Sequence, residues 1–234
     1  MAKEQKKAPE AEDLLTSSEA LAEQISKSEE FVKANKNILM GVLVAVVAAI
    51  GGTLFFQNSQ NSKNEEALKE LYPAEYSFKL DSTNLVLNGN DEFMGVTQVA
   101  ANYSGTPAAQ NANFKAGIIY INQGEFDKAI EHFKKFDADD LILQGRAYSL
   151  IGDAYSDQGK YDEAKEYYIK ASNYKPNEGF TPTYIMKLAA NYEMQKDYAA
   201  AVVEYEKLIK NYPKAADVAK AKKLKARASG LSKG

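Results

Sequence analysis

Cysteine and tryptophan are absent from this chain, and histidine occurs once in 234 residues. Without cysteine the chain cannot form disulfides, thiolate metal sites or cysteine nucleophiles, and its redox compartment stays open. The net charge of −3 provides no global field that would attract nucleic acid. The lack of these residues excludes most classes of catalytic site. We therefore expect no enzyme activity, no cofactor, no metal, no nucleic-acid partner and no small-molecule substrate.

The one histidine, His132, lies among Glu131, Lys134 and Lys135 on an expected helix. No candidate serine nucleophile accompanies it, so the paired base and nucleophile of a hydrolytic site are missing. We predict a solvated surface histidine at this position.

One long hydrophobic run is present, from Ile38 to Phe56, and it contains 19 residues without a charge. As a helix it would reach about 28 Å, enough to cross the hydrocarbon core of a bilayer. A cleaved signal peptide is the competing interpretation. The 37 preceding residues and the lack of a following Ala-x-Ala site favour a retained transmembrane helix at 38–56.

Basic residues near the predicted span indicate its orientation. Lys27, Lys33 and Lys36 come just before it, whereas Lys63 and Lys69 follow at a greater distance. This bias favours a cytoplasmic N-terminus and a translocated C-terminal part. In a bacterial inner membrane the C-terminal domain would then be periplasmic.

Small residues recur at helical spacing within the span. Such a stripe lets a partner helix approach closely in lipid, although glycine and alanine are also simply frequent in membrane helices. The stripe consists of Gly41, Ala45, Ala48, Ala49 and Gly52.

Residues 1–37 are predicted to form a cytoplasmic tail. Its first part, Met1–Leu15, is rich in Lys, Glu and Ala and is predicted to be disordered. Thr16 and Glu19 fit a helix capping box. The short helix that follows could lie on the membrane surface or contact a cytosolic partner, or it could extend the anchor. Its apolar residues are Leu21, Ile25, Phe31 and Val32.

Beyond the span, one pattern occurs three times: a tyrosine, an alanine nine positions later and an aromatic residue four positions after that. Equivalent positions lie 35 and then 37 residues apart, which is typical of a helix–turn–helix solenoid. An all-α fold is therefore predicted. The three sets are Tyr120, Ala129 and Phe133; Tyr155, Ala164 and Tyr168; and Tyr192, Ala201 and Tyr205.

Other residues at fixed offsets fit the same repeat. A small residue would allow the two helices of each pair to touch, at Gly117, Gly152 and Ala189. The turns between paired helices are expected at 123–125, 158–160 and 195–197, with Gly124 and Gly159 ending the first helices. Pro176 and Pro213 would stop the second helices of the last two pairs.

Together these positions resemble the tetratricopeptide repeat, over about Pro107–Pro213. The middle copy matches best, with Gly152, Tyr155, Gly159, Tyr161, Ala164, Tyr168, Ala171 and Pro176. The other copies depart from the pattern at Phe136, Lys196 and Leu208. The resemblance implies an α-solenoid for residues 107–213 that binds protein partners rather than transforms them.

The flanks of the repeats are predicted from the same pattern. Residues 57–106 would be a connector, irregular at 57–62, and a degenerate repeat, with a turn at Asn88–Asp91 and a helix over Phe93–Tyr103. Residues 214–234 would be a tail with a basic helix at Ala215–Ala228. This helix would cap the stack, or provide a landing site for acidic lipid or a partner.

In tetratricopeptide arrays the first helix of each pair lines a concave face that holds the ligand. An acidic C-terminus is not expected as ligand, because Asp153 and Asp157 stand where the family's carboxylate-clamp members need Lys and Asn. Partly hydrophobic segments suit the apolar and methionine side chains better. Alternatively, Phe114, Ile118 and Ile121 pack against the unit before them. By register, the groove would contain Phe114, Ile118, Ile121, Asn122, Arg146, Ser149, Asp153, Asp157, Met186, Glu193 and Met194.

The layout of one N-in membrane helix followed by about three repeats is similar to the YfgM-type ancillary subunits of the bacterial Sec translocon. That resemblance implies a role near a SecYEG-like channel, with a membrane-anchored periplasmic chaperone or isomerase, or unfolded clients, as protein partners and membrane lipid around the anchor. A periplasmic scaffold for cell-envelope or outer-membrane assembly is an alternative. A reversed, cytosolic scaffold is another.

Overall fold

The computed structural model describes residues 18–79 and 83–233, which contain eleven α-helices and no β-strand. The predicted all-α class is confirmed within these ranges. The chain divides into two compact units, Met1–Ser59 and Gln60–Gly234. The predicted disordered segment and Thr16 of the capping box lie outside the described residues.

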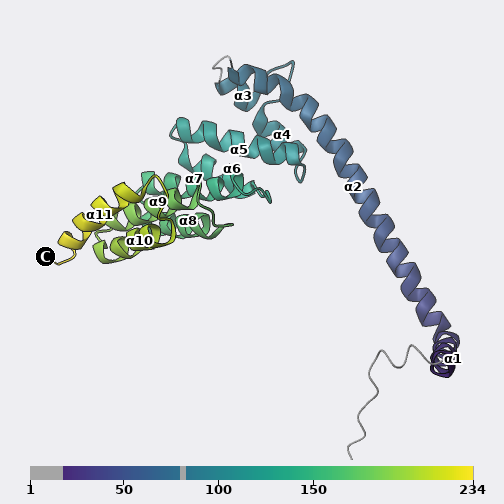
Figure 1. The fold of residues 1–234 in the computed structure, drawn as a ribbon. Coiled ribbons are helices and arrows are strands. Elements are labelled where there is room, and N and C mark those ends of the chain that lie inside the picture. Colours follow the sequence, from purple (N-terminus) through teal and green to yellow (C-terminus); the bar gives the residue numbers. More distant parts are fainter. Residues whose placement is uncertain (1–17, 80–82, 234) are drawn as a thin grey trace, which may run out of the picture. The chain divides into compact units, whose positions relative to one another are not determined.

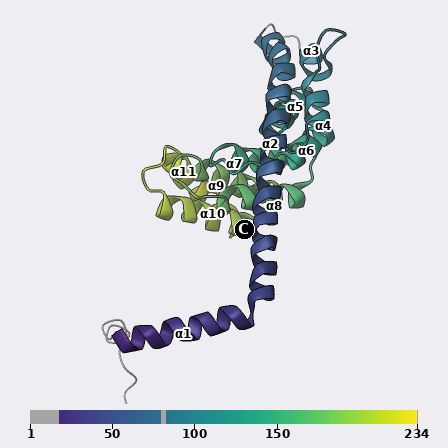
Figure 2. The ribbon, with the colours of Figure 1, turned by 90° about the vertical axis from the view of Figure 1, so that its right-hand side faces the viewer.

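The first unit contains helix α1, Ser18–Ala34, and the beginning of α2, Lys36–Lys79. The two helices are separated at Asn35, whose side-chain amide donates to the carbonyl of Phe31 at 2.9 Å (Figure 2). Three large apolar residues of α1 are exposed, namely Ile25, Phe31 and Val32. The predicted amphipathic pattern thus leaves an apolar surface on this helix uncovered.

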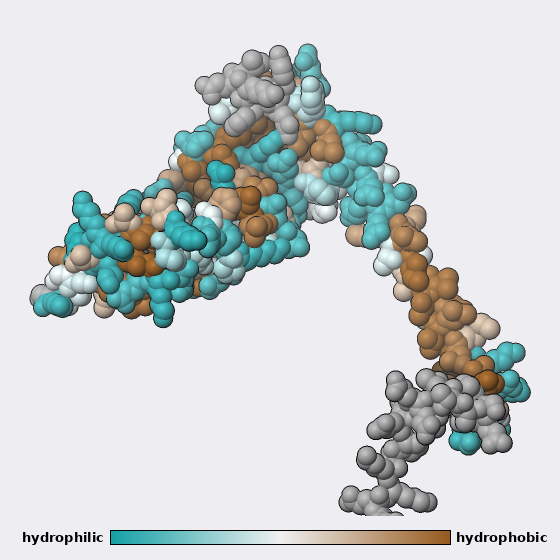
Figure 3. Space-filling model, in the orientation of Figure 1, coloured by the Kyte–Doolittle hydropathy of each residue, from teal (hydrophilic) through white to brown (hydrophobic). Residues whose placement is uncertain are grey.

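Helix α2 carries the hydrophobic run. The most apolar window of its candidate span has a mean hydropathy of 2.5, and none of that window is buried, so this part of α2 does not belong to a core. Figure 3 shows the run as a continuous hydrophobic column. Among the described residues, α2 is the one helix long and apolar enough to cross a membrane.

The prediction that residues 57–62 are irregular is wrong, because α2 continues through them to Lys79. Beyond them, Ala67, Leu71 and Ala74 are buried in the core of the second unit. Helical segments gain most of their stability from packing, and this burial extends the helix through a polar stretch of weak intrinsic preference.

Residues 83–106 begin with two short helices, α3, Thr83–Asn88, and α4, Val96–Asn102. The predicted turn between them is confirmed, and Gly89 adopts the left-handed conformation there with φ of 67°. Val86, Leu87, Val96 and Val99 share a core with the end of α2. The degenerate unit is therefore built from the end of one long helix and two short ones, instead of a regular helix pair.

Three helix pairs and a final helix follow, stacked in sequence order (Figure 1). The predicted repeats are confirmed as α-helical pairs. Their bounds are α5 Pro107–Asn122 and α6 Phe126–Lys135; α7 Leu143–Asp157 and α8 Tyr161–Asn173; α9 Thr181–Met194 and α10 Tyr198–Asn211; and α11 Val218–Leu231.

Glycine allows the close approach within the first two pairs. A Cβ atom added at Gly117 would lie 2.7 Å from the ring of Phe133, and one added at Gly152 would lie 2.6 Å from the ring of Tyr168. Both distances are shorter than non-bonded carbon atoms tolerate. The aromatic residue of each second helix therefore fills the space that the glycine of the first helix leaves open.

The three turns within the pairs share one backbone geometry. Gly124, Gly159 and Lys196 all have positive φ, of 75°, 72° and 62°. In each turn the next residue donates its amide to the carbonyl of the repeat tyrosine at 2.9 Å. Lys196 thus adopts a conformation that costs a residue with a side chain about 1 kcal/mol.

Helix α11 closes the stack. Ala221 and Ala228 are buried against α9 and α10 in the last core cluster. The ammonium of Lys225 pairs with Glu206 at 3.0 Å. The predicted capping helix is confirmed, and it begins at Val218 instead of Ala215.

Candidate protein-binding surface

The residues predicted for the concave groove lie on α5, α7 and α9, but only some of them face solvent. Asn122, Arg146, Asp157 and Met194 are exposed. The others take part in packing or in polar contacts between helices. Some of the residues predicted for the groove therefore form an exposed surface, and the others hold the helices beneath that surface together.

The polar residues of the second repeat hold neighbouring helices together. Lys187 on α9 pairs with Asp153 on α7 at 2.5 Å and donates to the hydroxyl of buried Ser149 at 3.1 Å. The hydroxyl of Tyr168 donates to the other oxygen of Asp153 at 2.8 Å. Burial, together with the nearby Asp153 carboxylate, raises the pKa of Tyr168. Asp153 and Ser149 are thus engaged within the protein.

Two residues of the third repeat are occupied in the same way. Met186 is buried in the last core cluster. Glu193 accepts from the hydroxyl of Tyr205 at 3.2 Å and forms an ion pair with Arg227 of α11. The cap helix therefore engages Glu193 within the protein.

Phe114, Ile118 and Ile121 are half-buried, and they pack in a cluster with α6 and α7. The ring of Phe114 lies 5.6 Å from that of Phe133 and 5.1 Å from that of Phe136. The alternative that these residues pack against the preceding unit is therefore wrong in direction, because their neighbours are the helices that follow.

Phe114 also lines a cavity of about 540 Å³. The cavity lies between the first turns of α5 and the connection from α6 to α7. We name it the α5–α7 cavity. Its walls are largely apolar, with two acidic residues of the connection, Asp137 and Asp139, at its edge. The residues that line it include Pro107, Gln110, Phe114, Phe136, Ala138 and Leu143.

An exposed apolar segment adjoins this cavity at the start of α7. Leu141, Ile142 and Leu143 are 48%, 41% and 38% exposed, and Leu143 also lines the cavity. We name these three residues the apolar edge. The carboxylate of Asp140 accepts from the amides of Ile142 at 2.8 Å and Leu143 at 2.7 Å, which fixes the segment. These backbone hydrogen bonds lower the pKa of Asp140.

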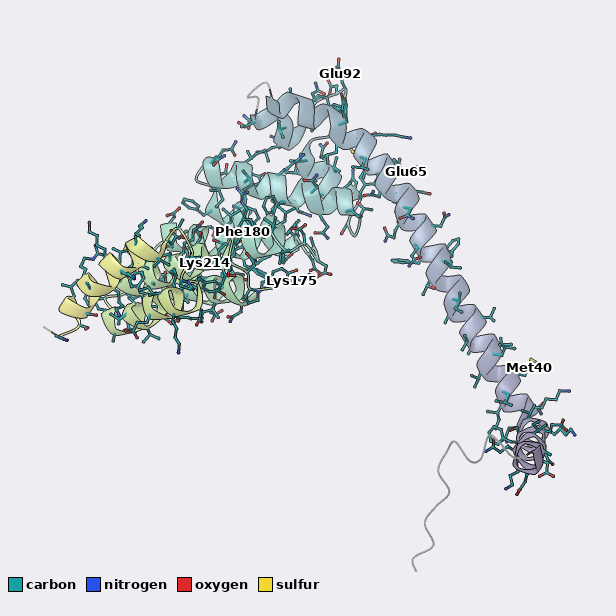
Figure 4. All side chains as sticks on the ribbon, in the orientation of Figure 1. Met40, Glu65, Glu92, Lys175, Phe180 and Lys214 are labelled. Atoms are coloured by element: carbon teal, nitrogen blue, oxygen red, sulfur yellow. The ribbon has the colours of Figure 1, made fainter. Side chains whose placement is uncertain are left out.

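The apolar edge was not predicted from the sequence, because the binding residues were assigned by helix register. A signal was present in three consecutive large aliphatic residues directly after acidic ones. Phe180, labelled in Figure 4, is exposed in the equivalent connection between α8 and α9. Both connections thus present apolar side chains just before a first helix.

A second feature missed by sequence reasoning lies on the second helices. Lys134 donates to the hydroxyl of Tyr155 at 3.0 Å, and this hydrogen bond raises the pKa of Lys134. The ammonium groups of Lys134 and Lys170 lie 5.7 Å and 4.4 Å from the ring centre of Tyr167. Each such cation–π contact at an exposed site stabilises the folded protein by about 0.5–1 kcal/mol.

The prediction of a solvated His132 is wrong. Its Nδ1 lies 2.9 Å from the side-chain oxygen of buried Asn113, and its ring stacks on Tyr120 at 5.4 Å. The amide of Asn113 donates to the carbonyl of Ala109 at 3.1 Å, which orients its oxygen toward the histidine. Burial lowers the pKa of His132, so the neutral ring is favoured. His132 thus joins α6 to α5.

No group of three or more His, Asp or Glu side chains in the described part of the chain could hold a metal ion. The small-residue stripe is exposed on α2 throughout, at Gly41, Ala45, Ala48, Ala49 and Gly52. A Cβ atom added at Gly41 or Gly52 would meet no other atom within 4 Å. A partner helix at this stripe stays a prediction.

The helix pairs define a class, the tetratricopeptide-repeat solenoid. One family profile described as tetratricopeptide repeat matches residues 110–137 and 145–178, and a second with the same description matches residues 184–215. The chain therefore contains three tetratricopeptide repeats. Because this fold typically serves as a non-catalytic platform for proteins, the solenoid is a protein–protein interaction scaffold.

The first of two similar solved structures shows the same fold. TPR-like repeats assigned to a kinesin light chain of Podosopora anserina match with a TM-score of 0.51 and 15% identity, over 74% of this chain and 86% of that one. The MamA protein matches with a TM-score of 0.46 and 18% identity, over 73% and 88%. No curated protein sequence matches the chain.

Proposed function

We propose that the protein is a single-pass scaffold of a bacterial inner membrane, anchored by α2, whose periplasmic solenoid receives polypeptides beside the Sec translocon. The observation that carries the proposal is the combination of an unburied apolar helix with a tetratricopeptide array in one chain. The greater number of lysines just before the span supports the periplasmic orientation.

The α5–α7 cavity and the apolar edge are the proposed contact surface. A cavity of about 540 Å³ lies within the range that ligand side chains or small molecules occupy. Leu141 and Ile142 stay exposed beside it, and exposed apolar patches mark interaction sites. An emerging polypeptide exposes apolar side chains before it folds. Phe114 and Phe136 would form the wall against which such a side chain packs.

Affinity purification from gently solubilised membranes tests the function. The wild-type protein is expected to recover channel subunits and a membrane-anchored folding factor. Persistent absence of both would contradict the association. Recovery of division or outer-membrane assembly proteins instead would favour the alternative of an envelope scaffold.

Substitutions at two exposed positions test whether the proposed contact surface, and not another part of the solenoid, binds the partners. The double variant Leu141→Asn and Ile142→Asn should reduce recovery of partners, because it removes the two most exposed side chains of the apolar edge without opening the core. Val203→Asn is the matched control, since Val203 is a 60% exposed aliphatic residue on α10. Equal loss in both variants would contradict the assignment of the surface.

The orientation requires a separate measurement. Because the chain has no cysteine, a single introduced cysteine can be labelled specifically. Asn177 is unsuitable, since its side-chain oxygen accepts from the amides of Gly179 and Phe180. Glu178 is exposed beside it and leaves this turn intact. In intact cells with a permeabilised outer membrane, Glu178→Cys should react with an impermeant reagent. Protection until the inner membrane is broken would indicate a cytosolic solenoid.

A further inference from the structure

Basic residues are concentrated at the C-terminal end of the solenoid. Lys214 to Lys233 contains seven basic residues and one acidic residue, a net charge of +6 in a chain whose total is −3. Helix α11 itself has no Asp or Glu between Val218 and Leu231. The end of the stack therefore has a charge opposite to that of the rest of the chain.

Only two of these basic residues form ion pairs within the described residues of the protein. Lys225 pairs with Glu206, and Arg227 pairs with Glu193. The remaining five lysines are exposed, and none of them forms an ion pair within the part of the chain that the structure describes. We name the four of them that precede Lys225 the basic patch. They are Lys214, Lys220, Lys222 and Lys223.

The helix directs the patch away from the stack. Ala221 and Ala228 form the buried stripe of α11, one above the other at a spacing of seven residues. At 3.6 residues per turn, Lys223 lies on the opposite face, with Lys220 and Lys222 on either flank. Lys214 lies in the connection before α11 and is labelled in Figure 4.

The acidic groups near α11 do not neutralise the patch. Asp217 precedes the helix, and its carboxylate accepts from the hydroxyl of Thr183 on α9 at 3.3 Å. Glu204 on α10 is 3.6 Å from Lys207 of the same helix. With Glu193 and Glu206 already paired, the exposed lysines present an uncompensated positive surface.

We propose that the basic patch binds the headgroups of an anionic phospholipid bilayer, the same membrane that α2 crosses. The inference rests on the anchoring part of the proposed function. From Phe56, at the end of the apolar run, to buried Ala67 of the second unit, α2 advances about 16 Å. The anchor thus keeps the second unit at high effective concentration next to one bilayer surface.

Charge and geometry favour a bilayer over a discrete acidic protein. A membrane surface presents many anionic groups over an area, and each lysine close to it shifts the equilibrium about fivefold. The patch is a spread of exposed lysines over more than one face of α11 and the connection before it. An extended, fluid anionic surface matches such a spread.

The test uses the full chain reconstituted into nanodiscs. Ala226 is exposed on α11, and Ala226→Cys gives a unique site for bimane because the chain has no cysteine. Quenching by headgroup spin-labelled lipid reports contact between α11 and the bilayer. Nanodiscs of phosphatidylcholine alone are compared with nanodiscs that also contain phosphatidylglycerol.

Quenching is expected to be several-fold stronger with phosphatidylglycerol, and to be lost at about 1 M salt, where the Debye length falls to about 3 Å. The triple variant Lys220→Gln, Lys222→Gln and Lys223→Gln should remove the difference between the two lipids. The matched triple variant with arginine at the same positions should retain it, because the charge is kept. A bimane at Ala199→Cys, exposed on α10, controls for lipid quenching elsewhere.

Equal quenching in the two lipid compositions, or an unchanged lipid difference in the glutamine variant, would overturn the inference. A bimane response to added polyglutamate without any response to phosphatidylglycerol would assign the patch to acidic proteins and also overturn it. Failure of the chain to co-purify with nanodiscs is a different result, because it would show that α2 does not anchor the protein.

Discussion

Single residues set the spacing between the helices of this solenoid. Gly152 faces Tyr168 so closely that even a methyl group has no space. Lys196 takes the left-handed turn conformation that glycine provides in the first two repeats. The ring of His132 is partly buried and contacts the side chain of Asn113. The identity of the residue at each of these positions therefore follows from local packing and backbone conformation more than from chemistry at the surface.

Gly152→Ala is expected to destabilise the solenoid by about 1–3 kcal/mol, because overpacking moves the buried ring of Tyr168 or the helix. Gly230→Ala is the control, since Gly230 lies in a helix with open space around it. That change should be neutral or stabilising by up to about 1 kcal/mol. Urea unfolding of the full chain in detergent micelles, followed by circular dichroism, measures both. A cost for Gly152→Ala no larger than the control would contradict the close packing.

The histidine provides a prediction on pH. Its pKa should lie below the ordinary value of 6.5, because burial disfavours the charged ring. The unfolded chain then binds a proton more readily than the folded one. The contribution of His132 to stability is therefore complete above pH 6.5 and declines as the pH falls from there through the folded-state pKa.

With one histidine in the chain, a single imidazole resonance reports the titration. A midpoint at or above 6.5 would contradict the burial. His132→Gln should also remove a part of the stability change between neutral and mildly acidic pH. Unfolding measurements at both pH values provide this second readout.

At the scale of the element, polar contacts join the first helices of neighbouring repeats alongside apolar packing. Lys187 of α9 reaches Asp153 and Ser149 of α7. These contacts join one repeat to the next and engage two residues of the predicted groove within the protein, whereas the apolar edge is exposed.

A double-mutant cycle with Asp153→Asn and Lys187→Gln should give a coupling of about 0.5–1 kcal/mol for the free energy of unfolding. The value is modest because both side chains are about one third exposed. It should decrease at high salt. Additive effects of the two changes would mean that the ion pair does not join the repeats in solution.

The helices of the repeats could be predicted from the sequence because each repeat contains the residues that its own helix pair needs for packing. The tyrosine, glycine and alanine positions determine the pairs, and the turns follow from Gly124 and Gly159. The extension of α2 beyond Phe56 was not predictable from local preference, since Ala67 and Leu71 stabilise it through distant partners. The same holds for His132, whose environment comes from Asn113, 19 residues earlier. The site was predicted only in part, because helix register does not reveal which exposed connection is apolar.

At the scale of the whole molecule, the two units differ in the surface that they present. The first presents an unburied apolar helix, and the second is a tetratricopeptide scaffold with an apolar edge. A scaffold held at a membrane surface can bind partners that it would meet too rarely in solution, because tethering raises their effective concentration. The function proposed here depends on both units being present in one chain.

Site-specific photo-crosslinking in native membranes tests the central claim most directly. A photoreactive residue at Ile142, on the apolar edge, is compared with one at Val203 on α10, which is also exposed and aliphatic. The account predicts adducts from Ile142 that contain translocating polypeptides or channel subunits, and few from Val203. No adduct from Ile142, or the same adducts from both positions, would contradict it.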